Sequence, residues 1–179
     1  MKTKILALLL LLVMLVSCGS TVSTDTTDSA DTTDSADTTD TPSVYDESTA
    51  IALLEMMRPS VEAEQLTVYI DPLPLRDAEL FSYHFFVKPN KSITEAAICQ
   101  PTNGVTPFFL GILKVSSEKE AKALADDVYD NIDYRKLICT TFEKAYTRAV
   151  GKTVILILDG DAERADRMLA LWEALPDKS

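Results

Sequence analysis

Hydrophobic residues are distributed very unevenly along this chain. One unbroken apolar run extends from Ile5 to Val16, whereas residues 21–41 are almost wholly Thr, Asp, Ser and Ala, in near-repeats of six residues. A segment without large apolar side chains cannot bury enough surface to offset the entropy lost on ordering. We therefore predict a disordered tether over residues 18–43 and one small folded domain over residues 44–179.

The first part of this domain has a mixed pattern. Apolar residues at helical spacing predict an N-terminal helix over Asp46–Met57, which we expect Pro59 to stop. Leu66–Ile70 has the composition of a short strand before Pro72. Residues 75–91 fit a short helix and an irregular aromatic stretch equally well.

The remainder of the domain reads as two strand-strand-helix units. Two hairpins are predicted, and the helix after the first begins with a Ser-x-x-Glu capping box at Ser117. The helix after the second carries Ala165, Met168, Leu169 and Trp172 on one face. The paired strands are Ile93–Gln100 with Pro107–Val115, and Glu143–Val150 with Lys152–Leu158. We therefore expect an α+β fold, an antiparallel sheet with helices on one face.

The N-terminus has the order of a secretory signal. Lys2 and Lys4 precede the apolar run, which predicts a signal peptide over residues 1–17. The tetrapeptide Leu15-Val16-Ser17-Cys18 resembles the lipobox of bacterial lipoproteins. This resemblance implies that Cys18 carries a diacylglyceryl group, labelled by palmitate, and becomes the first residue after cleavage. Two acyl chains suffice for stable anchoring, so we expect a protein anchored to the cell membrane on its extracytoplasmic face.

Charge and composition narrow the classes of partner. The formal net charge is -11, and an acidic chain lacks the basic face that nucleic acid binding requires. Three Cys and one His are too few for a structural zinc site of the usual kind. We expect no metal and no cofactor.

Few residues suggest chemistry, and none forms a recognisable catalytic motif, so we predict no catalytic residues. The aromatic cluster of Phe81, Tyr83, His84 and Phe85 is the best candidate for a binding surface, although such residues also build cores. Cys99 and Cys139 are candidates for a disulfide or, in their apolar contexts, for two free buried thiols.

Three further segments carry a family resemblance. They are Glu95-Ala96-Ala97-Ile98, Gly111-Ile112-Leu113-Lys114-Val115 and Gly151-Lys152-Thr153-Val154. Together with the lipobox, they resemble the bacterial lipoprotein family catalogued as domain of unknown function 4358. The resemblance implies an exported lipoprotein with an α+β fold and brings no catalytic residues.

Two functions of different classes follow from these patterns. The first is a non-enzymatic module in the cell envelope that binds an envelope protein or a cell-wall ligand. The alternative is a cell-wall-acting hydrolase or thiol enzyme that uses Cys99 or Cys139 with His84, which would have to lie within hydrogen-bond reach of each other.

Overall fold

The computed structural model describes residues 43–136 and 140–175. The predicted signal peptide and tether, Cys18 and Cys139 lie outside this part of the chain. The described helices are α1 (Val44–Glu47), α2 (Ala50–Ala63), α3 (Ala78–Phe85), α4 (Glu118–Asp130) and α5 (Ala162–Glu173). The strands are β1 (Val68–Pro72), β2 (Ile93–Pro101), β3 (Phe108–Val115), β4 (Lys144–Val150) and β5 (Thr153–Asp159).

The five strands form one antiparallel sheet in the order β1-β2-β3-β5-β4. The α+β class is confirmed, as are both hairpins and the helix after each of them. Local signals explain this agreement. The Ser117 side chain accepts a hydrogen bond from the Glu120 amide at 3.3 Å, and Asp161 accepts one from the Arg164 amide at 2.9 Å. Each side chain thereby caps the first turn of its helix.

The N-terminal helix differs from the prediction over Asp46–Met57. The chain forms the short α1 first, and α2 then begins after the Thr49 cap and continues through Pro59 to Ala63. A proline inside a helix costs about 3 kcal/mol. Here the apolar face of α2, which runs on to the fully buried Val61, lies against the sheet and offsets that cost.

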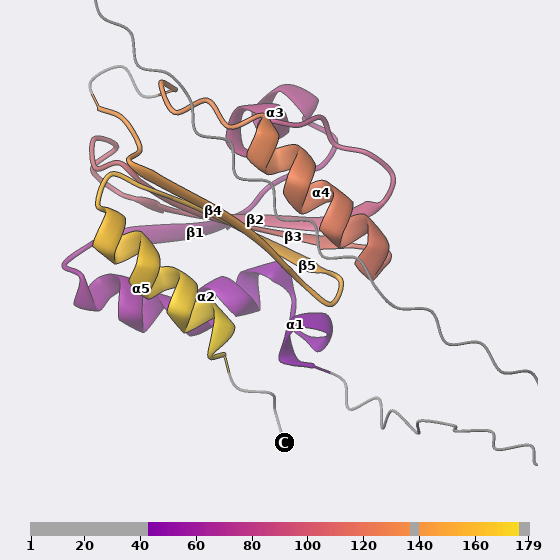
Figure 1. Ribbon diagram of the computed structural model, residues 1–179, viewed down its shortest axis with the longest axis horizontal. Coiled ribbons are helices and arrows are strands. Elements are labelled where there is room, and N and C mark those ends of the chain that lie inside the picture. Colours follow the sequence, from indigo (N-terminus) through magenta and orange to yellow (C-terminus); the bar gives the residue numbers. More distant parts are fainter. Residues whose placement is uncertain (1–42, 137–139, 176–179) are drawn as a thin grey trace, which may run out of the picture. The chain divides into compact units, whose positions relative to one another are not determined.

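Helices cover both faces of the sheet, so the prediction of helices on one face is wrong. Figure 1 shows α1, α2 and α5 on one side of the sheet, and α3 and α4 on the other. The buried side chains accordingly form two clusters, one with Leu54, Met57 and Trp172, and one with Phe85 and Val128. The cause is visible in the central strands, since every residue of β3 and β5 is buried. A continuous apolar strand requires cover on both of its faces.

The chain enters the domain through an N-terminal strap, residues 43–48, that is tied to three distant parts of the fold. The backbone carbonyl of Tyr45 accepts hydrogen bonds from the buried Lys114 ammonium and from the Thr153 hydroxyl. The Tyr45 hydroxyl donates to the carbonyl of Trp172 in α5. The start and the end of the described domain are therefore joined side by side.

Candidate functional site

The predicted aromatic binding surface is mostly core. Phe81 and Phe85 are fully buried, His84 is 6% exposed, and only Tyr83 stands out, at 54%. The rings of Phe85 and Phe109 pack edge to face, with centroids 6.1 Å apart. Because α3 turns its aromatic face into the sheet, a ligand could contact only Tyr83 of the four residues without moving the core.

His84 is held by neighbours rather than poised for chemistry. The amide nitrogen of Gln100 lies 3.2 Å from its Nδ1, and the Tyr69 hydroxyl donates to Gln100 Oε1 at 2.7 Å. The His84 ring also stacks on Phe109 with an interplanar angle of 10°. Burial, with a smaller contribution from Lys136, lowers the pKa of His84 to about 4. The imidazole is therefore neutral at pH 7, and its Nδ1 already accepts a hydrogen bond.

The exposed face of Tyr83 has a partner within the chain. The Lys136 ammonium lies 3.8 Å from the centre of the Tyr83 ring and 5.2 Å from that of Phe86, and it donates a hydrogen bond to the Tyr83 carbonyl. Burial lowers the pKa of Lys136 to about 8. The cation that an aromatic surface would attract is thus supplied by the protein itself.

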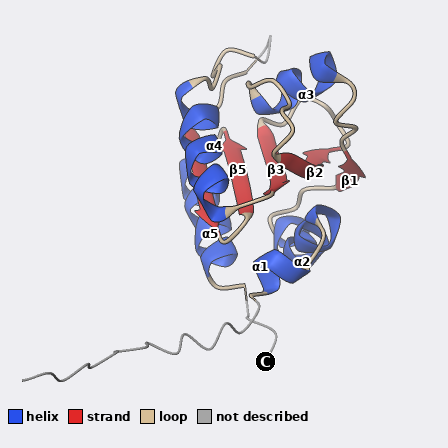
Figure 2. Ribbon diagram, turned by 90° about the vertical axis from the view of Figure 1, so that its right-hand side faces the viewer, coloured by secondary structure: helices blue, strands red, loops and turns tan. Residues whose placement is uncertain are grey.

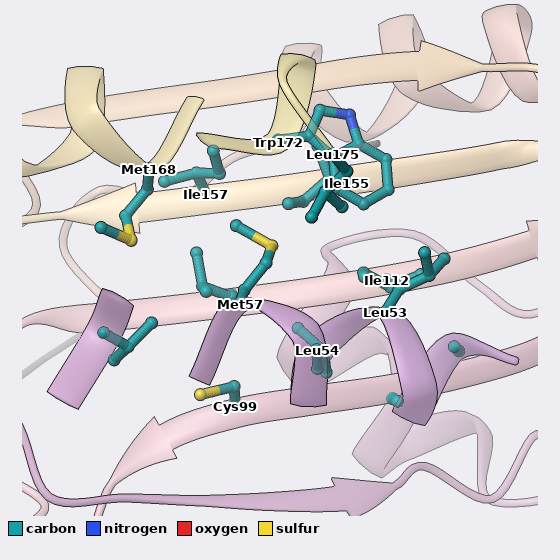
Figure 3. Close-up of a cluster of buried hydrophobic side chains, with 14 of the residues drawn as sticks. Leu53, Leu54, Met57, Cys99, Ile112, Ile155, Ile157, Met168, Trp172 and Leu175 are labelled. Atoms are coloured by element: carbon teal, nitrogen blue, oxygen red, sulfur yellow. The ribbon is translucent and has the colours of Figure 1, made fainter. Parts of the chain in front are cut away.

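Cys99 and His84 cannot form the nucleophile and base of the alternative enzyme. Cys99 faces α2 and packs near Leu54 and Met57 (Figure 3), whereas the next residue of β2, Gln100, contacts His84 on the opposite face of the sheet. Successive side chains of a strand point to opposite faces. Burial also raises the pKa of the Cys99 thiol to about 12, so the reactive thiolate is absent at pH 7.

Of the two cysteines in the predicted domain, the structure describes Cys99. Cys99 is a free, buried thiol, while Cys139 lies outside the described residues, as does the predicted lipidation site Cys18. The version of the enzyme hypothesis that uses Cys99 is therefore wrong.

Polar groups at the two ends of β5 are held by structural hydrogen bonds. The Gly151-Lys152 pair forms the turn between β4 and β5, and the Lys152 amide donates to Asp46 Oδ1 at 2.7 Å. Asp159, at the end of β5, is fully buried and paired with Arg164, whose Nη2 lies 2.7 Å from its Oδ1. Within residues 43–136 and 140–175, no group of three or more His, Cys, Asp or Glu residues is placed to hold a metal ion.

A groove of about 670 Å³ lies between α4 and the edge strand β4. Figure 2 shows α4 and α5 flanking this end of the sheet. One wall comes from α4 and the turn after it, and the other from β4 and the residue before it. The lining residues are Asp126, Tyr129, Asp130, Tyr134, Glu143, Lys144, Ala145, Tyr146, Thr147 and Arg148.

Five consecutive residues of β4, from Lys144 to Arg148, line this groove. Neighbouring side chains of a strand point to opposite faces, so a groove lying on one face of a sheet would meet every second residue. A run of consecutive residues indicates that the groove follows the edge of β4 that has no strand partner among the described residues.

The hydrogen-bond pattern identifies the backbone groups at that edge. The Lys152 carbonyl and the Gly160 amide bond with residues of or next to β3, so even-numbered residues of β5 face β3 and odd-numbered ones face β4. The odd-numbered residues of β5 are paired with even-numbered residues of β4, which therefore face β5. The amides and carbonyls of Ala145, Thr147 and Ala149 therefore point outward, and β5 is the one strand that β4 pairs with in the described chain.

The two sides of the groove differ in charge. The α4 side presents Asp126 and Asp130 together with Tyr129 and Tyr134, which are 49% and 39% exposed. On the other side, the cations of β4 are already matched by α5. Lys144 Nζ lies 3.1 Å from Asp166, and Arg148 Nε lies 3.8 Å from Glu173.

Only part of this groove is visible in the sequence. The acidic stretch on α4 can be read from the spacing of its Asp residues, and it suggests a solvated helix face. Nothing local indicates that Tyr129 and Tyr134 stand beside β4, because this contact depends on the strand order.

Among the described residues, no helix combines the length and the apolar character needed to cross a membrane. Comparison of the chain with protein-family models, curated proteins and solved structures finds no match. The resemblance to the lipoprotein family of unknown function therefore stays a prediction, and the function has to be argued from the groove and from the sequence.

Proposed function

We propose that this protein is a lipid-anchored binding module on the extracytoplasmic face of the bacterial cell membrane. It is non-enzymatic and takes an envelope component in the groove between α4 and β4. The observation that carries the proposal is the groove itself, where the edge of β4 that has no strand partner among the described residues lies beside exposed tyrosines and carboxylates.

The anchoring part of the proposal is supported by the lipobox-like tetrapeptide that ends at Cys18. Two acyl chains contribute about 0.8 kcal/mol for each buried methylene, which suffices for stable attachment. The six Asp residues of the predicted tether make it acidic, so an anionic membrane surface repels it. The domain is thereby held at a distance from the lipid headgroups.

The anchor is tested by labelling cells with radioactive palmitate and separating membranes from soluble protein. The wild-type chain is expected to take up label and to sediment with membranes, and Cys18→Ala is expected to lose both properties. Cys99→Ala is the matched control, because it removes a thiol from the buried core and should keep the label. A Cys18→Ala chain that still carries palmitate would contradict the anchoring proposal.

The groove is tested by comparing two exposed tyrosines. Tyr134 in the groove and Tyr69 on β1, at the opposite edge of the sheet, are both 39% exposed. Crosslinking of the full chain in envelope preparations should yield a partner that Tyr134→Ala loses and that Tyr69→Ala keeps. Equal retention by both variants would show that the binding surface lies elsewhere.

A further inference from the structure

We infer that the occupant of this groove is an extended peptide segment that pairs with β4 as a sixth strand and directs basic side chains toward α4. This inference rests on the proposed function, because it names the chemistry of the partner at the same groove.

Strand pairing is favoured by the backbone of β4. The outward amides and carbonyls of Ala145, Thr147 and Ala149 lie at the spacing of an antiparallel ladder. The Thr147 carbonyl accepts a hydrogen bond from Arg148 Nη1 at 2.9 Å, which an added strand would have to share or displace. β4 has seven residues and therefore offers an edge of about 24 Å, at roughly 3.4 Å per residue. The side chains of these three residues are small; Ala145 and Thr147 are each 8% exposed and reach the surface at the groove.

The face toward α4 selects basic side chains. Ala145 and Ala149 belong to or pack against the core cluster on the α4 side. Residues of an added strand that lie opposite them would point to the same side. There they would meet the carboxylates of Asp126 and Asp130, for ion pairing, and the tyrosine rings of the groove, for cation–π contact.

The opposite face places no charge requirement on the partner. Tyr146 donates its hydroxyl to Asp166, which also accepts from Lys144, and Arg148 has Glu173 as its partner. Small polar side chains such as Thr can lie beside these satisfied groups. The preferred segment therefore alternates a basic residue with a neutral one.

A second copy of this chain fits the groove less well. Antiparallel pairing of two β4 edges requires a two-fold axis perpendicular to the sheet, so both α4 helices would lie on the same face. Each α4 carries five acidic and two basic residues, and the carboxylates of the two helices would approach each other across the new strand pair. Like charges in that arrangement oppose association.

The inference is tested with two labelled nine-residue peptides of identical composition. One alternates Thr and Lys throughout, and the other groups the same five Thr and four Lys into two blocks. Fluorescence anisotropy with the full chain in detergent should show that the alternating peptide binds about tenfold more tightly, equivalent to about 1.4 kcal/mol. Equal affinity for the two peptides would overturn the inference, because bulk charge attraction would then account for binding.

Matched charge variants locate the contact. The double variant Asp126→Asn/Asp130→Asn should weaken binding of the alternating peptide about tenfold, since it removes two carboxylates from the groove. Asp127→Asn removes an exposed carboxylate of the same helix that does not line this groove, and it should change the affinity less than twofold. A larger loss with Asp127→Asn than with the double variant would overturn the assignment.

Hydrogen exchange separates strand pairing from surface attraction. Bound alternating peptide should protect the amides of Ala145, Thr147 and Ala149, whereas the blocked peptide should not. Protection confined to another surface, or protection of β4 without peptide in a chain that sediments as a dimer, would overturn the inference. Palmitate labelling and the loss of the envelope partner in Tyr134→Ala do not depend on these outcomes. The proposed function is therefore tested separately from this inference.

Discussion

Gly111, at the middle of β3, lies where two aromatic rings leave no room for a side chain. An ideal Cβ added there would lie 2.5 Å from Cε1 of Phe85 and 2.8 Å from Cε1 of Phe109. Carbon atoms in optimal contact are about 3.5–4.0 Å apart, so a single methyl group overlaps the first ring by about 1 Å. Both rings are buried in the core cluster on the α4 side of the sheet and cannot turn into solvent.

We therefore expect Gly111→Ala to lower the free energy of unfolding by about 1–2 kcal/mol. Overpacking of a core typically costs about 1–3 kcal/mol. The replacement of a strand glycine by alanine returns about 0.5–1 kcal/mol through the reduced entropy of the unfolded chain. Urea unfolding of residues 43–179, followed by far-ultraviolet circular dichroism, measures the difference.

A double-mutant cycle identifies the ring as the cause. Phe85→Ala alone should cost about 3–5 kcal/mol. It removes the closer of the two rings with which the new methyl group collides, and it leaves space into which the ring of Phe109 can shift. In that background, Gly111→Ala should cost less than 0.5 kcal/mol, which gives a coupling energy of about 1 kcal/mol or more. Additive effects in the cycle, or a Gly111→Ala domain as stable as the wild type, would refute the packing argument.

Three further predictions concern the buried polar groups. The pKa of His84 is about 4 in the folded domain, against about 6.5 unfolded. The contribution of the neutral imidazole to the free energy of unfolding is therefore present at pH 7.5 and is lost as the pH falls to 4. Urea titrations of His84→Gln should lack about 3 kcal/mol of this pH-dependent loss. Arg164→Met should destabilise the domain by about 3–5 kcal/mol, because it leaves the buried Asp159 carboxylate without its cation; Asp159→Asn should recover part of this in the double variant, and full stability of the single variant would contradict the argument. In a chain without the other two cysteines, Cys99 should resist a thiol reagent at pH 8 until urea unfolds the domain, because burial raises its pKa to about 12; rapid labelling of the folded domain would contradict this.

Much of the fold follows from short-range signals in the sequence. The Ser117 cap, the Gly151 turn and the apolar stripe through Trp172 each act within a few residues, and each is where the sequence predicts it. Pro59 is a different case, because its local tendency to end a helix is outweighed by the burial of Val61 two residues later.

The candidate groove depends on long-range order that short-range signals do not carry. A hairpin pattern shows that β4 pairs with β5, but not that β5 lies against β3 and leaves β4 at the edge. The position of Lys136 over Tyr83, 53 residues earlier in the chain, depends in the same way on tertiary packing. The cover on both faces of the sheet could have been predicted from the sequence, because β3 begins with six residues, 108–113, that carry no polar side chain.

The contact between Tyr45 and Trp172 brings the two ends of the described domain together. A chain whose ends meet can be joined there by a short linker and opened at an exposed loop, such as the turn around Gly104 between β2 and β3, without disturbing its core. The same contact couples the local unfolding of the two ends. Fraying of α5 removes a partner of the strap, and fraying of the strap removes a partner of α5.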